Sequence, residues 1–126
     1  MTNSDLVRAF IDAFNRKDID AVSAFFADDA VYHNMPVAPI VGRTAIRENI
    51  AGYTRPAAQI EWLLYAIAES ANGSVLTERL DRFLMQGKWV ELPVMGTFEF
   101  EGGKISAWRD YFDMNQFTSQ LPGSKP

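Results

Sequence analysis

The stretch QIEWLLYAIA at residues 59–68, followed by SVLTERLDRFLM at residues 74–85, decides the fold class. At residue 59 the spacing of apolar side chains changes from a helical period to the alternation of β-strands. The alternation continues over residues 89–100 and 104–113, and each short connection between these segments contains glycine. Such connections are typical of antiparallel hairpins, so the second half of the chain is predicted to form a four-stranded sheet.

The first half of the chain is predicted to be mainly helical. Apolar residues at helical spacing indicate two helices, at residues 6–14 and 19–26, and a third that ends before Pro56. We expect Ser4 or Asp5 to cap the first helix.

A short strand is expected at residues 30–34, after a solvated turn at Asp28 and Asp29 and before a Pro-rich loop. Long strands twist and curve, so this order of elements predicts an α+β domain with a curved antiparallel or mixed sheet. The sheet would wrap around the N-terminal helices as a cone and leave a central apolar pocket.

Composition limits the possible functions. The chain has 126 residues, of which 48% are hydrophobic, as expected for a single domain covering residues 1–126. A net charge of −4 without a Lys/Arg cluster argues against a nucleic-acid partner. With no Cys and one His, the chain alone cannot build a disulfide, a thiol nucleophile or a multi-histidine metal site, and no cofactor is expected.

No segment has the pattern of a signal peptide or a membrane span, so the expected compartment is the cytoplasm and no membrane partner is expected. Residues 121–126 are polar and rich in Pro and Gly, and we expect them to form a flexible tail.

Two charged segments, ERLDRF at residues 78–83 and WRDYFD at residues 108–113, interrupt strands that should be apolar. Alternate side chains of a strand share a face, so Arg79 lies with Asp81, and Asp110 lies with its aromatic neighbours. A buried carboxylate persists only when it is paired and hydrogen-bonded, or when function requires it. An Asp/Arg/Asp cluster in an apolar pocket is therefore the working hypothesis.

Each part of this cluster also has a simpler interpretation. An isolated pair such as Arg79 and Asp81 is more often a solvated cross-strand charge pair. Tyr32 and Asn34 could satisfy backbone groups at a strand end. The second carboxylate, Asp110, and the face that Tyr32 and Asn34 share with the cluster favour a functional site.

The opposite face of the sheet is predicted to be an outer surface. Arg109 and Asp113 alternate to this face, as ion-pair or dimer residues, and His33 also points away from the cluster. Apolar side chains lie there among the charges, which predicts a homodimer; they are Leu76, Leu80 and Tyr111.

Three blocks occur in the order and at the approximate spacing of a known family: YHNMP at residues 32–36 followed by Gly42-Arg43, TERLD at residues 77–81, and GKISAWRDYFD at residues 103–113. As a set, they resemble the limonene-1,2-epoxide hydrolases of the cone-shaped NTF2-like and SnoaL-like superfamily. The resemblance covers most of the chain. A departure is the Pro/Ala-rich segment at residues 53–59, where apolar bulk is usual, and this leaves the substrate's identity open.

The resemblance implies an epoxide hydrolase that adds water to a hydrophobic terpene-like or cyclic epoxide and forms a vicinal diol in one step. It implies that Tyr32 and Asn34 hold the water, Asp110 is the general base and Asp81 the general acid, with Arg79 as the bridge. The pair of acids can share a proton rather than both ionise. The expected substrate contacts are Met35, Phe83, Leu92, Val94, Trp108, Phe112 and Phe117.

Other functions use the same fold. A ketosteroid isomerase-like or SnoaL-like isomerase or cyclase needs an Asp acid/base but no bridging Arg. A non-catalytic small-molecule-binding module is the third alternative. Within the hydrolase interpretation, Asp110 could also attack carbon and form an ester.

Overall fold

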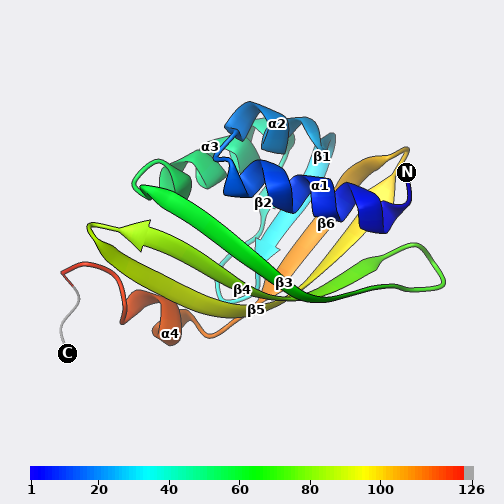
Figure 1. Cartoon of the computed structure of the whole chain (residues 1–126). Coiled ribbons are helices and arrows are strands. Elements are labelled where there is room, and N and C mark those ends of the chain that lie inside the picture. Colours follow the sequence, from blue (N-terminus) through cyan, green and yellow to red (C-terminus); the bar gives the residue numbers. More distant parts are fainter. Residues whose placement is uncertain (124–126) are drawn as a thin grey trace.

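The structure of the protein is a computed structural model that describes residues 1–123. Figure 1 shows its helices and strands in chain order. They are α1 (Asn3–Asn15), α2 (Ile19–Ala24), β1 (Phe26–Asn34), β2 (Ile40–Val41), α3 (Arg43–Thr54), β3 (Gln59–Glu69), β4 (Val75–Met85), β5 (Lys88–Glu101), β6 (Lys104–Tyr111) and α4 (Met114–Thr118).

Helix α1 begins one turn earlier than its apolar pattern. Thr2 is the N-cap: its hydroxyl accepts a hydrogen bond from the Asp5 amide, and the Asp5 carboxylate accepts one from the Thr2 amide. This reciprocal capping box satisfies two amides at the helix start. The prediction that Ser4 or Asp5 is the cap was wrong, because Asp5 holds the third helical position.

The second predicted helix is shorter and the first strand longer than expected. Helix α2 ends at Ala24, and Phe26 already belongs to β1, where it lies opposite Ile105 of β6. Asp28 and Asp29 therefore lie within a strand and do not form the predicted turn. The β1–β6 register shifts between Phe26 and Val31, and this irregularity lets the strand carry two exposed carboxylates.

The four C-terminal strands are confirmed, with one correction at the end of β6. The strand stops at Tyr111 because the Asp113 side chain accepts hydrogen bonds from two amides and caps α4, a helix that was not predicted. Leu121, in the predicted flexible tail, packs against the core. Residues 124–126 of that tail lie outside the described residues.

One mixed sheet of six strands has the order β2-β1-β6-β5-β4-β3. All neighbours are antiparallel except β1 and β6, which run parallel. In Figure 1 the sheet curves beneath α1, α2 and α3, which lie on one side of it, while α4 lies at the far end near the C-terminus. The predicted α+β architecture, a curved sheet with N-terminal helices, is confirmed.

An aromatic cluster fills the space between the helices and the sheet. Trp108 is fully buried and contacts Phe10, Phe98 and Tyr32, with the Tyr32 ring stacked at 4.1 Å between centroids. This close packing holds Trp108 and Tyr32 in fixed positions beneath the polar residues of the site. Within residues 1–123, no helix has the length and apolar character needed to cross a membrane.

Candidate active site

Arg79 of β4 lies at the centre of a buried ion cluster. Its Nε and Nη2 donate to the two oxygens of Asp81 at 3.0 and 2.9 Å, and Nη2 also donates to Asp110 Oδ2 at 2.8 Å. Its Nη1 donates to Thr77 Oγ1 at 3.1 Å and to Asp110 Oδ1 at 3.3 Å. These contacts use all five N–H groups of the guanidinium, which holds both carboxylates in place.

Burial makes this cluster unusual. Arg79 is 1% exposed, and Asp81 and Asp110 are each 3% exposed. Desolvation is the main influence on Asp81 and raises its pKa to about 6, although the Arg79 charge opposes the shift. Asp81 can therefore hold a proton in mildly acidic solution, where an ordinary aspartic acid has lost it.

Asp110 has a different set of partners. Besides Arg79, its Oδ1 accepts a hydrogen bond of 2.7 Å from the indole Nε1 of Trp108, two residues earlier on the same face of β6. The two acids thus share one cation but differ in their remaining contacts.

Gly96 of β5 makes the cluster sterically possible. It lies opposite Asp110 in the β5–β6 register and opposite Thr77 in the β4–β5 register. A Cβ atom at this position would lie 2.2 Å from Asp110 Oδ1 and 2.5 Å from Arg79 Nη1. Strand alternation marks position 96 as inward-facing, but only the structure shows that the inward space is already filled.

The end of β1 brings Tyr32 and Asn34 to the same place. Asn34 lies directly beside Asp110 in the parallel β1–β6 register, and Tyr32 lies beside Trp108. The Tyr32 hydroxyl is 3.2 Å from the hydroxyl of Tyr53 on α3. Burial raises the pKa of both hydroxyls, so both stay protonated over the ordinary pH range.

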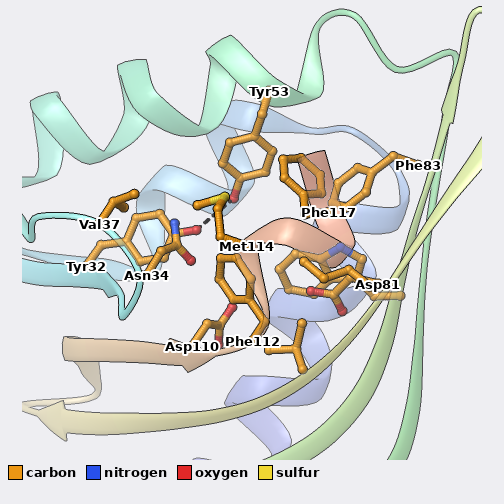
Figure 2. Close-up of a pocket in the computed structure, with 13 residues that line it drawn as sticks. Tyr32, Asn34, Val37, Tyr53, Asp81, Phe83, Asp110, Phe112, Met114 and Phe117 are labelled. Atoms are coloured by element: carbon orange, nitrogen blue, oxygen red, sulfur yellow. Dashed lines mark hydrogen bonds between the residues drawn. The ribbon is translucent and has the colours of Figure 1, made fainter. Parts of the chain in front are cut away.

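These groups open onto a cavity of about 130 Å³. Figure 2 shows Tyr53 reaching down from α3, with Phe83 and Phe117 beside it, and Asp110 on the opposite side. The wall is mostly apolar with a few polar groups. It consists of Tyr32, Asn34, Val37, Tyr53, Trp62, Asp81, Phe83, Leu92, Val94, Asp110, Phe112, Met114 and Phe117.

Most of the predicted site residues meet at this cavity. Four of the five expected catalytic side chains line it, and Arg79 lies behind the two carboxylates. Two expected substrate contacts do not line it. Trp108 is sealed in the aromatic core, and Met35 lies in the loop after β1, 37% exposed. The substrate contacts that do reach the cavity are Phe83, Leu92, Val94, Phe112 and Phe117.

Four lining residues were not predicted. Trp62 lies on the inward face of β3 together with Ile60. The alternation of side chains along this strand could have indicated its position. Tyr53 and Val37 reach the cavity only through the placement of α3 and of the Pro-rich loop. Met114 belongs to α4, which the Asp113 cap could have indicated.

Three charged or polar residues were expected outside the site. Arg109 forms an ion pair with Glu99, as predicted for the outer face. His33 is bonded to the carbonyl of Val37 at 2.9 Å and does not line the cavity. Asp113 does not lie on the outer face of β6 as predicted, because the strand ends at Tyr111 and the Asp113 carboxylate caps α4.

Known proteins are similar to this chain in sequence and in fold. Residues 1–123 match the family described as the limonene-1,2-epoxide hydrolase catalytic domain. The chain is 35% identical over 119 residues to epoxide hydrolase EphG of Mycobacterium tuberculosis (strain ATCC 25618 / H37Rv). The aligned region covers 93% of this chain and 78% of that protein.

Solved structures give the same result. An LEH-like epoxide hydrolase from M. tuberculosis superposes with a TM-score of 0.82 at 31% identity, covering 94% of this chain and 88% of the other. A SnoaL-like protein from Shewanella denitrificans OS-217 is alike in fold alone, with a TM-score of 0.80 at 14% identity over 94% of this chain and 95% of the other. The chain therefore belongs to the limonene-1,2-epoxide hydrolase catalytic-domain family.

Proposed function

We propose that this protein adds water to a hydrophobic cyclic or terpene-like epoxide and releases a vicinal diol, without a cofactor. The observation that carries the proposal is the buried Arg79 that joins Asp81 and Asp110 in the wall of an apolar cavity. Water is a poor nucleophile and an alkoxide a poor leaving group, so hydrolysis in one step needs a base and an acid together. Two carboxyl groups on one cation can supply both.

In the proposed step, Tyr32 and Asn34 hold a water molecule beside Asp110. Asp110 takes one proton of the water while the water oxygen bonds to an epoxide carbon. The carbon–oxygen bond of the ring breaks, and the ring oxygen takes the proton of Asp81. One proton then moves from Asp110 to Asp81 and restores the starting state.

The electrostatics of the cluster support this division of roles. Burial raises the pKa of Asp81 to about 6, which favours a protonated acid at that site. Asp110 accepts hydrogen bonds from Trp108 and Arg79, and these bonds hold its carboxylate in position to act as the base. Arg79 stabilises the single negative charge, whichever acid carries it.

A panel of cyclic and terpene epoxides, assayed for vicinal diols, tests the activity. Asp81→Asn and Asp110→Asn should each lower kcat by about 10²–10⁴-fold, the usual contribution of a positioned acid or base. Asp29→Asn, on the exposed part of β1, is the matched control and should keep full activity. Absence of diol, with isomerisation of a β,γ-unsaturated ketone to its enone, would instead indicate an isomerase.

Single turnover in ¹⁸O-labelled water separates direct water attack from an ester on Asp110. Direct attack places the label in the diol formed in the first turnover. Unlabelled diol from that turnover, with label entering the Asp110 carboxylate, would contradict the one-step mechanism.

A further inference from the structure

Tyr53 brings a second phenol group to the cavity wall, beside Tyr32. It lies in the last turn of α3, and its hydroxyl is 3.2 Å from the Tyr32 hydroxyl on β1. The dashed line in Figure 2 joins these two oxygens. The Tyr53 ring stacks on Phe14 at 6.4 Å between centroids and meets Phe83 edge to face at 6.1 Å. The proposed chemical step uses Tyr32 but gives Tyr53 no part.

The Tyr32 phenol is held in one place by its surroundings. Its ring stacks on Trp108 with 4.1 Å between centroids and 12° between the ring planes, and the residue is 3% exposed. With the ring fixed, the freedom that remains to the hydroxyl is the direction of its single proton. In a hydrogen bond between two hydroxyls, one donates and the other accepts. The direction of the Tyr32 proton is therefore coupled to that of Tyr53.

The charge of Asp110 favours one of the two directions. Burial is the main cause that raises the pKa of both hydroxyls, but the charge of Asp110 comes next for Tyr32 and only after the effects of Tyr32 for Tyr53. In Figure 2, Tyr53 and Asp110 lie on opposite sides of the cavity. A negative charge attracts the positive end of an O–H dipole. The Tyr32 proton is thus drawn toward the carboxylate, and its oxygen is left to accept from Tyr53.

This direction matches the needs of the water in the proposed step. One proton of the water goes to Asp110, and the amide oxygen of Asn34 accepts the other, so the water oxygen has only its lone pairs to offer. One lone pair accepts from Tyr32 while the other faces the epoxide carbon. If Tyr32 donated to Tyr53 instead, it would present a lone pair to a water that has no proton left for it.

We propose that Tyr53 is a positioning residue whose O–H donates to Tyr32 and so turns the Tyr32 proton toward the nucleophilic water. This inference rests on the proposed epoxide hydrolysis and adds a residue of α3 to it. The helix then takes part in aligning the water, although Arg79 and both acids belong to strands.

The variant Tyr53→Phe keeps the aromatic ring and removes the O–H. We expect kcat for cyclohexene oxide, or for the fastest epoxide of the panel, to fall about 3–10-fold, the effect of one neutral hydrogen bond. KM should not rise, because Tyr53 does not bind the substrate. Tyr65→Phe is the matched control, since Tyr65 is 61% exposed on β3 and does not line the cavity. That variant should keep the kcat of the wild type.

The variant Tyr32→Phe separates positioning from a structural role. It removes the hydroxyl through which Tyr53 acts, so adding Tyr53→Phe to it should lower the rate no further. A residue that only supports the fold would lower the rate by the same factor in both backgrounds. The wild type, both single variants and the double variant are compared in single turnover with enzyme in excess over the epoxide, so that slow variants are also measured.

Each other result overturns the inference. An equal loss in both backgrounds means that Tyr53 acts independently of Tyr32. An unchanged kcat in Tyr53→Phe means that the direction of the Tyr32 proton does not limit turnover. A rise in KM with kcat unchanged means that Tyr53 binds the substrate itself. Absence of diol from the wild type with every epoxide of the panel, by contrast, contradicts the proposed hydrolysis.

Discussion

Gly96→Ala tests whether the spacing of Arg79 and Asp110 controls turnover. The added methyl carbon would meet Asp110 Oδ1 at 2.2 Å, so the carboxylate and the guanidinium must move apart. We expect kcat to fall by about 10²-fold, the typical cost of a displaced catalytic group. Steady-state kinetics on the folded variant measures the loss.

The control for this change is Gly52→Ala, in α3, where an added Cβ has no atom within 4 Å. It should leave kcat unchanged and stabilise the helix by up to about 1 kcal/mol. Equal activity of both alanine variants would show that the site tolerates a wider spacing of its ions.

The proton on Asp81 should be visible in the pH dependence of kcat/KM. A general acid works only when protonated, and burial raises the pKa of Asp81 to about 6. As the pH rises through about 6 the acid loses its proton, so kcat/KM should fall, approaching about tenfold per pH unit. The profile is measured from about pH 5 to about pH 8 with a diol assay. A rate that climbs over this interval would contradict the role of Asp81 as the acid.

At the scale of elements, α4 closes one side of the cavity and depends on one cap. Asp113 Oδ1 accepts from the amides of Asn115 and Gln116 at 2.9 and 3.4 Å, and Met114 and Phe117 of this helix line the cavity. Asp113→Ala should cost about 1 kcal/mol of stability and loosen this wall. We expect KM to rise while kcat changes little.

Asp18→Ala provides the comparison for the cap of α4. Asp18 caps α2 through the amide of Ala21, away from the cavity. A similar loss of stability on denaturant unfolding, with KM unchanged, is expected for this variant. If both variants raise KM alike, the effect is a general loss of stability rather than a loosened wall.

Strand alternation predicted the meeting of Arg79, Asp81 and Asp110 because it is a local property that survives any arrangement of the strands. The end of β6 was misjudged because Phe112 and Asp113 continue the alternation by chance, and a five-residue helix has too little periodicity to oppose it. Tyr53 could not be assigned to the cavity from its helical spacing alone. Whether the end of α3 faces core or cavity depends on how the sheet curves beneath it.

At the scale of the whole molecule, the outer face of the sheet is the predicted dimer surface. Leu76, Met95 and Tyr111 are 44%, 51% and 48% exposed and line one shallow hollow. Exposed apolar side chains gathered in this way are typical of an interface. We expect the wild type to dimerise in sedimentation experiments and Met95→Lys to shift it toward monomer.

Val41→Lys is the matched control for the dimer prediction. Val41 is 64% exposed on β2, which is an edge strand of the sheet and lies outside the proposed dimer surface. The added charge there should leave the sedimenting mass unchanged. A wild type that sediments as a monomer at every concentration would contradict the predicted homodimer.

The parallel pairing of β1 with β6 has a consequence for protein synthesis. Asn34 leaves the ribosome early, but its sheet neighbour Asp110 belongs to β6, which is translated after the other five strands of the sheet that residues 1–123 form. Contacts between residues so distant in sequence form slowly, because a long loop must close first. A nascent chain that lacks β6 therefore holds Tyr32 and Asn34 on an unpaired strand edge. Until translation of β6 is complete, that edge needs protection from other chains.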